Sequence, residues 1–508
     1  MRFKKLLYLY IIIANIFFSN NCFCQIKDPI LPRHNVTLNE AHIGSAEIDT
    51  MLLNSYEVSP SNILRFYLDS RGVFEKSNAD FTSKQIVETA LNNDTKLMGG
   101  PMLGDVKANG ISIWFRPSNE LPIHIKVIAL NSDKESVYTL KPSAAGKEER
   151  LIINDLSPSM KYKYVVTSHD IIIAAGVFQT TPRIDEKKQV RVTFGSCFHK
   201  IGLHNPNLIN SILKREPHAM MLLGDIAVDD RENNFSMHRS DYLLRDVSPA
   251  WKKLAANVPL YTSWDDHDYL NNDLSGVPEI FTKEDIEELR TLWRQNWNNP
   301  PNDAEGIYFN TRIGQVELIM LDTRSCREIE KRGEYGSYLG TEQMEWLKSV
   351  LKKSTATFKV ISSGTMWSDY ISNGKDSWGT WDIQAREEIF QLIEKEYISG
   401  VLLVSGDRHG ARGFTIPRES GFKFYEFEPA SLGGVPGPPS MANDTTNQLF
   451  GYHGKGLIAF GEFTFNMGVS KPQVTFRLID EFGIIMEEHV LSYKMLTPNT
   501  TGHLAVFQ

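Results

Sequence analysis

The feature that most constrains the fold is an alternation of short apolar runs with helix-period segments after about residue 189. Apolar runs of four to eight residues, bounded by turn residues, are typical of buried strands. The predicted strands are 190–195, 219–224, 260–264, 316–321, 358–362 and 401–405, and the predicted helices are 207–214, 341–353 and 383–397. Strands that alternate with helices predict an α/β layered domain, which we place at residues 189–495.

Reactive side chains follow four of these predicted strands directly. The first run is followed by Cys197 and the second by Asp225. The third leads into Trp-Asp-Asp-His-Asp at 264–268, and the last into Ser-Gly-Asp-Arg-His at 405–409. In layered α/β folds, ligand sites gather at the carboxyl ends of strands, so the four ends are expected to converge on one crevice. A lone Gly-Asp is usually a turn and a lone cysteine usually a small buried side chain, so the convergence is the stronger observation.

The types of these side chains indicate a metal site. Carboxylates and imidazoles bind hard or borderline cations, and a thiolate favours a softer or trivalent ion. The three carboxylates within 265–268 repel one another unless water or cations neutralise them, and a solvated acidic loop is the alternative interpretation. Asp225 is a candidate bridge between two ions, which at about 3.5–4 Å apart activate water and clamp a phosphoryl group. His199, two residues beyond Cys197, is a further candidate ligand.

The residues before this domain form two regions of different character. Residues 25–96 are polar and partly helical, with helical spacing at 83–91, and we assign them no chemistry. Residues 97–183 contain short strands separated by turns, which predicts an all-β sandwich of the immunoglobulin or fibronectin type. A charged segment at 183–188 without apolar periodicity is a natural linker.

The first 24 residues have the pattern of a secretory signal peptide. Arg2, Lys4 and Lys5 precede a nearly unbroken apolar run at 6–18. Thirteen residues are too few for a membrane-spanning helix, which needs about 20. The sequence therefore predicts an exported protein that is periplasmic, on the cell surface or secreted. Lipidation of a leader cysteine is the alternative to cleavage near Cys24.

Charge and cysteine content exclude some classes of function. The chain has 54 Lys and Arg against 62 Asp and Glu, and loss of the leader brings the net charge to about −11. Such a protein does not attract nucleic acid through its general charge. Beyond the leader only Cys197 and Cys326 remain, so the fold does not depend on a disulfide framework. The two cysteines could pair, or one could be a reactive or ligating thiol.

Several motifs together resemble the PhoD-like alkaline phosphatases and phosphodiesterases, of the calcineurin-like metallophosphoesterase superfamily. They are Phe-Gly-Ser-Cys (194–197), Gly-Asp (224–225), Trp-Asp-Asp-His-Asp (264–268), Leu-Asp-Thr-Arg (321–324) and Ser-Gly-Asp-Arg-His (405–409), with Gly-Pro-Met-Leu-Gly-Asp-Val (100–106) opening the sandwich. The resemblance implies a two-layer β-sandwich core flanked by helices and a site with two or more metal ions. It implies hydrolysis of phosphate esters, as monoesters or diesters, through attack by a metal-activated hydroxide or oxo group.

The resemblance also implies roles for individual residues. Cys197 and His409 would hold one ion, often ferric iron in this family. Asp225 would bridge, and Asp266 and Asp407 would hold a second ion such as calcium. His267 would act at the leaving oxygen by donating a proton or stabilising charge. Arg408 and Asn272 are the candidate phosphate contacts.

One position departs from the family pattern. Members that bind ferric iron carry a tyrosine three residues after the bridging aspartate, whereas this chain has Val228, which cannot ligate a metal. Either Asp229 or Asp230 compensates, or the ion is a different one.

Two other classes of function stay open at this stage. In one, the protein is a non-catalytic surface binder with a decayed phosphatase core, which Val228 favours and the retained candidate ligands disfavour. In the other, Cys197 is the nucleophile of a thiol hydrolase. The second leaves the acidic clusters unexplained.

Overall fold

The computed structural model describes residues 36–132, 134–302, 304–371, 376–452, 456–468 and 470–499. The predicted signal peptide lies outside these residues. Within them, none of the helices combines the length and the apolar character needed to cross a bilayer.

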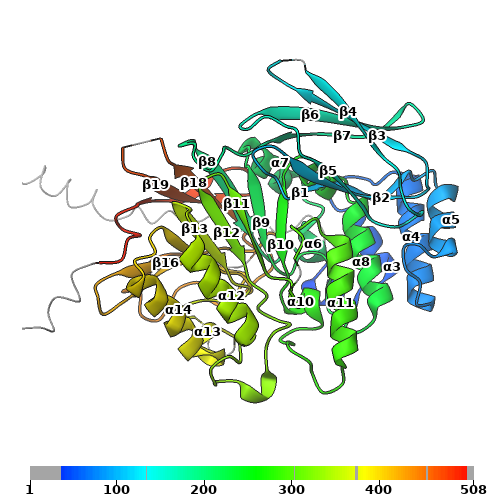
Figure 1. The fold of residues 1–508 in the computed structure, drawn as a ribbon. Helices are drawn as coiled ribbons and strands as arrows, with labels where there is room; N and C mark the ends of the chain where they lie inside the picture. The colour runs from blue at the N-terminus through cyan, green and yellow to red at the C-terminus, as the bar shows by residue number, and fades with distance from the viewer. Residues whose placement is uncertain are drawn as a thin grey trace, which may run out of the picture.

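Two large sheets form the centre of the molecule (Figure 1). The first has the order β10-β9-β8-β18-β19-β20, and the second has the order β11-β12-β13-β14-β16-β15-β17. The strands of the first are β8 (Val190–Gly195), β9 (Ala219–Leu223), β10 (Leu260–Ser263), β18 (Ala459–Asn466), β19 (Gln473–Asp480) and β20 (Ile485–Ser492). Those of the second are β11 (Phe309–Ile313), β12 (Val316–Met320), β13 (Phe358–Ser362), β14 (Val401–Val404), β15 (Ala411–Pro417), β16 (Lys423–Pro429) and β17 (Gln448–Tyr452). In each sheet the strands that precede the motifs run parallel, so their carboxyl ends lie at one edge.

The sheets pack face to face through aromatic and aliphatic side chains. The Phe427 and Phe476 rings stack with centroids 4.1 Å apart, and the centroids of Phe358 and Phe465 lie 5.1 Å apart, and each pair joins the two sheets. Successive strand residues face opposite sides, so Met221 lies in this inner core while Met220 packs outward against helices. Both faces of β9 are therefore buried, which explains its continuous apolar sequence.

Helices cover the outer faces of both sheets. On one side lie α7 (Pro206–Lys214), α8 (Phe235–Val247) and α9 (Pro249–Ala255), and on the other α12 (Gly340–Lys353) and α14 (Ile383–Lys395) (Figure 1). The short helices α6 (His199–Gly202) and α10 (Asp266–Tyr269) begin in the segments that leave β8 and β10. The prediction of a mixed α/β fold is confirmed.

Seven further strands lie between residues 97 and 179. One sheet has the order β1-β2-β5 and the other β4-β3-β6-β7. The strands are β1 (Leu97–Gly104), β2 (Ile111–Pro117), β3 (Ile123–Ala129), β4 (Glu135–Leu140), β5 (Glu149–Ile153), β6 (Lys161–Ser168) and β7 (Ile171–Gln179). Apolar residues of both sheets share one core, as Ile113 and Val127 do. The assignment of this region to the immunoglobulin or fibronectin type stays a prediction.

The region before the strands contains more helix than the sequence predicted. It holds α2 (Leu38–Ile43), α3 (Ala46–Leu53), α4 (Ser61–Lys76) and α5 (Lys84–Asn92), of which only the last corresponds to the predicted helix at 83–91. Helix α4 packs against α8, and α2 packs against α6. The first helices of the region therefore reach the edge where the motif-bearing strands end.

Candidate metal centre

The strands that carry the motifs end in tight turns at the shared edge. Cys197, Asp225 and Asp407 each have a positive φ, of 56°, 55° and 70°. Aspartate adopts this left-handed conformation more readily than most residues, but cysteine rarely does, so the turn at Cys197 is held by its surroundings. The backbone N–H of Cys197 donates to Gly224 O over 2.9 Å, and that of His199 donates to Asp225 O over 2.9 Å. These bonds fix the end of β8 against the end of β9.

Gly224 is required where these strand ends meet. Its φ is 102°, and a Cβ at this position would lie 2.6 Å from the backbone nitrogen of Asp265. A side chain here would push apart the ends of β9 and β10. The glycine thus brings Asp225 close to the 264–268 motif.

The first group of candidate ligands mixes sulfur, nitrogen and oxygen. One atom from each of Cys197, His199, Asp225 and His409 lies within 4.8 Å of the others. The Nδ1 atoms of both histidines are already bonded, to Asp229 Oδ1 at 2.8 Å and to Pro436 O at 3.1 Å. Metal-ligating histidines typically bond a carboxylate or carbonyl oxygen in this way, which leaves Nε2 for the ion.

The second group consists mainly of carboxylates. Asp265, Asp266 and Asp407 form one cluster, and Asp225, Asp266 and His267 form another. Asp225 belongs to both the sulfur-containing group and this acidic group, as a bridging ligand would. The buried Arg324 lies against this group, with Nε bonded to Asp265 and Nη2 3.6 Å from Asp266 Oδ1.

His267 is held with one ring nitrogen toward the acidic group. Its Nδ1 is 2.7 Å from Asp230 Oδ1, and its ring also joins the cluster with Asp225 and Asp266. Burial lowers the pKa of His267, but the carboxylates of Asp266, Asp225 and Asp230 outweigh this and raise the pKa to about 12. In the absence of cations, this raised pKa favours the protonated ring beside the candidate ligands.

Several buried ligand atoms in these groups have no hydrogen-bond partner among the described residues. They are Asp225 Oδ1, Asp265 Oδ2, Asp266 Oδ1, Asp407 Oδ2 and His199 Nε2. Buried polar atoms rarely lack a hydrogen-bond partner. A bound cation would supply the missing partner, because each of these oxygen and nitrogen atoms can donate an electron pair to a metal ion. The residues present thus fit a metal centre.

The charges lead to the same conclusion. Burial, together with the Asp225 carboxylate, raises the pKa of the Cys197 thiol well above its ordinary value. Burial, together with Asp265 and Asp266, also raises the pKa of Asp407. Thiols and carboxylates bind a metal ion in their ionised forms. A bound cation would lower the raised pKa values of these groups and so allow Cys197 and Asp407 to be ionised at the same time. A raised pKa also argues against Cys197 as a free thiol nucleophile, and neither Cys197 nor Cys326 is in a disulfide.

The structure thus brings Cys197, Asp225, Asp266, His267, Asp407 and His409 together at one edge. Arg408 lies beside them, with Nη1 3.8 Å from Asp407 Oδ2. Asn272 is exposed and its side chain bonds Asp273, although its backbone N–H donates to Asp230 Oδ1 over 3.0 Å.

Sequence reasoning missed the supporting residues. Asp229 and Asp230, which the sequence offered as substitutes for the missing tyrosine, are bonded to His199 and His267 and are not among the four residues of the sulfur-containing group. Asp268 accepts the backbone N–H groups of Ile226 at 3.0 Å and Ala227 at 3.2 Å, so it anchors the loop after Asp225. Asp265 and Asp268 form a capping box at the start of α10, a spacing that the sequence contains.

The sequence assigned no chemistry to residues 25–96, but the structure places His42 of this region beside the candidate ligands. Its imidazole belongs to two of the candidate clusters, one with His199 and Asp229 and one with Asp230 and His267. No sequence signal marks it, because it lies more than 150 residues from its partners.

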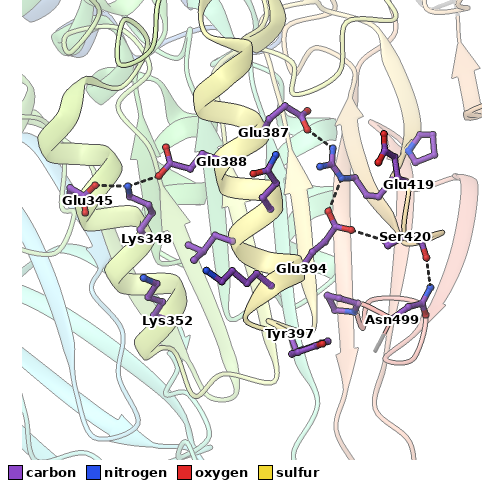
Figure 2. A pocket seen from close by; sticks show the side chains of 16 residues that line it. Glu345, Lys348, Lys352, Glu387, Glu388, Glu394, Tyr397, Glu419, Ser420 and Asn499 are labelled. Atoms are coloured by element: carbon purple, nitrogen blue, oxygen red, sulfur yellow. Dashed lines mark hydrogen bonds and ion pairs between the residues drawn. The ribbon is translucent and has the colours of Figure 1, made fainter. Parts of the chain in front are cut away.

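A separate surface pocket lies beside the helices α12 and α14 (Figure 2). It has a volume of about 1020 Å³ between α12, α14 and the 417–420 turn. Two of the cations that line it are paired, since Lys348 Nζ is 2.7 Å from Glu388 (Figure 2) and Arg418 Nη1 is 2.6 Å from Glu387. It contains none of the candidate ligands.

Comparison with known proteins agrees with the site. Residues 220–453 match the family described as PhoD-like phosphatase. They form a PhoD-like phosphatase domain. This confirms the resemblance found in the sequence motifs.

Relatives extend the comparison. Alkaline phosphatase D from Bacillus subtilis (strain 168) is 25% identical over 218 residues, which are 37% of this chain and 36% of that protein. The match thus spans about a third of that relative's length. The solved structure of PhoD superposes with a TM-score of 0.62 at 17% identity, covering 78% of this chain and 88% of the other. Purple acid phosphatase PPD1 from yellow lupin (Lupinus luteus) superposes with a TM-score of 0.56 at 14% identity, covering 78% of this chain and 75% of the other. These two structures share the fold.

Proposed function

We propose that the protein is a metal-dependent phosphatase that hydrolyses phosphate esters. The observation that carries this proposal is the sharing of Asp225 by a sulfur-containing group and an acidic group. When bound, a pair of cations supplies Lewis-acid activation of water and of the phosphoryl group. The PhoD-like phosphatase domain supports the same reaction class.

The two groups suit different ions. Cys197, His199, Asp225 and His409 offer a thiolate, two imidazoles and a carboxylate, a set that suits ferric iron or another ion tolerant of sulfur. The oxygens of Asp265, Asp266 and Asp407 suit a hard cation such as calcium. Val228 is fully buried among apolar side chains, and we propose that His199 supplies the donor that the valine cannot.

The remaining side chains divide the work of binding and proton transfer. His267 lies beside Asp225 and Asp266, and we assign it a role at the leaving oxygen of the substrate, to which it donates a proton or lends its charge. Asp230 fixes its ring by accepting from Nδ1 over 2.7 Å. Arg408, partly buried beside Asp407, is the candidate contact for a phosphate oxygen.

We also propose export, on the basis of the leader at residues 1–24. Expression of the full chain in a Gram-negative host, followed by fractionation, tests this. Recovery in the periplasm, on the surface or in the medium, with residues 1–24 removed, is expected; retention of the leader in the cytoplasmic fraction would refute it.

The test of the function combines elemental analysis of the purified protein with assays on a phosphomonoester and a phosphodiester. A phosphatase is expected to hold at least two ions per chain and to hydrolyse one or both esters. A folded chain with no stoichiometric metal and no turnover would instead be the non-catalytic surface protein that the sequence left open.

A further inference from the structure

The N-terminal helix α2 places a histidine against the candidate metal centre. His42 Nδ1 lies 3.0 Å from Asp230 Oδ2, and His42 Nε2 lies 3.8 Å from Asp229 Oδ1. The imidazole of His42 also lies against those of His267 and His199, with ring centroids 4.5 and 5.5 Å away. One side chain from the first helix thus contacts both the residues that hold the site histidines and the histidines themselves.

The position of His42 is built into the fold. The core residue Arg231 donates from Nη1 to the backbone oxygens of His42 and Ile43, over 2.9 and 3.2 Å. Arg231 is itself held by Asp241, with Nε 2.7 Å from Oδ2. A Cβ on Gly44 would lie 2.4 Å from Arg231 Nη2, so glycine is needed where the chain leaves the helix. The same loop that carries Asp229 and Asp230 therefore binds the end of α2.

Asp230 is the residue that connects His42 to His267. Its Oδ1 accepts from His267 Nδ1 over 2.7 Å, while its Oδ2 faces His42. Oδ1 also accepts the backbone N–H of Asn272 over 3.0 Å, so the contact with His42 is what restrains the other oxygen. Loss of that contact leaves the carboxylate free to turn about Oδ1, and the plane of the His267 ring is then less firmly fixed.

We propose that His42 is a positioning residue of the phosphatase: through Asp230 it fixes the orientation in which His267 serves the leaving oxygen. The inference rests on the proposed function. It makes the N-terminal region part of the catalytic unit, where the sequence had suggested only packing.

The test uses three variants of the full chain. His42→Ala removes the contact with Asp230, and His42→Asn keeps it, because the asparagine Nδ2 occupies the place of the imidazole Nδ1. Ile43→Ala is the matched control, since its side chain is 71% exposed one residue away on the same helix. Each is assayed on p-nitrophenyl phosphate and on phenyl phosphate, whose leaving group is the poorer one.

Misplacing a proton donor slows the poorer leaving group most, because that group depends most on protonation. For His42→Ala we expect kcat on phenyl phosphate to fall about 10- to 100-fold, as for other residues that hold a functional histidine. We expect a clearly smaller fall on p-nitrophenyl phosphate, little change in KM and unchanged metal content. His42→Asn should recover most of the loss, and Ile43→Ala should match the wild type.

Four outcomes overturn the inference. His42→Ala could behave like Ile43→Ala, could slow both substrates equally, or could lose metal along with activity, which would make His42 a structural residue or a ligand. A loss of activity that His42→Asn fails to recover would also count against it. If the metal-loaded wild type hydrolyses only diesters, the same comparison is made on the methyl diesters of p-nitrophenyl and phenyl phosphate. If it hydrolyses neither the monoesters nor the diesters, the proposed function fails and this inference with it, which separates the two failures.

Discussion

Asp229 and His199 form a buried pair in which Oδ1 and Nδ1 are 2.8 Å apart and neither side chain is exposed to solvent. The second oxygen of Asp229 accepts the backbone N–H of Lys200 over 3.0 Å. Burial, despite the Asp229 charge, lowers the pKa of His199, so its ring is neutral. A neutral imidazole with Nδ1 engaged and Nε2 buried without a partner is prepared to bind a cation.

The first prediction concerns this pair. The Asp229→Asn substitution removes the negative charge of the side chain. Its amide nitrogen is a donor, so it cannot accept a hydrogen bond from whichever group it faces, the Lys200 N–H or His199 Nδ1. We expect affinity for the ion of the sulfur-containing group to fall about 10- to 100-fold. Metal titration measures it, with Asp444→Asn on the exposed 441–447 loop as the control. An unchanged affinity would remove His199 from the proposed ligands.

The second prediction concerns metal removal. Without cations the carboxylates of Asp225, Asp266 and Asp407 repel one another, so a chelator is expected to lower thermal stability as well as activity. An ion present at about 1,000 times its Kd contributes about 4 kcal/mol to the free energy of unfolding. Calorimetry with and without chelator measures this. An unchanged melting temperature with full loss of metal would contradict the site described.

The third prediction concerns a histidine away from the centre. Burial, and then the charge of Arg191, lower the pKa of His218 from 6.5 to about 4, and its Nδ1 accepts the backbone N–H of Arg191 over 3.2 Å. Between these pH values the unfolded chain binds more protons than the folded one. His218 therefore contributes stability that is present above pH 6.5 and is lost as the pH falls toward 4.

His218→Asn keeps an acceptor oxygen but cannot titrate, which isolates this effect. The wild type should lose stability relative to the variant as the pH falls from 6.5 to 4, by at most about 1.4 kcal/mol per pH unit. Urea unfolding at several pH values measures the difference. A constant difference across the range would show that His218 is not held neutral.

The sequence predicted the strands and the residues at their ends because both follow from burial. A strand covered on both faces must be continuously apolar, and the first polar residues after it mark where it leaves the core. Four predicted strands were one residue too long, since Gly224, Trp264, Leu321 and Ser405 already belong to the turns. Two of them, Gly224 and Trp264, leave the ladder directly before Asp225 and Asp265, whose side chains belong to the candidate ligand groups.

The supporting residues were less predictable. Asp229 and Asp230 follow the Gly-Asp motif closely, but nothing in their spacing shows that they face histidines 30 and 37 residues away. His42 arrives through the docking of a separate helix, a tertiary contact that no local pattern encodes. Helix α4 was missed although its 16 residues pack against α8.

The most direct test of the central claim is the metal content and turnover of Asp225→Asn beside the wild type. Asparagine has the same shape but lacks the charge to bridge two cations. We predict at least two ions per wild-type chain, fewer in the variant, and a loss of turnover above about a hundredfold with the fold intact. Full turnover, or an unchanged metal content, in a folded Asp225→Asn protein would contradict the account.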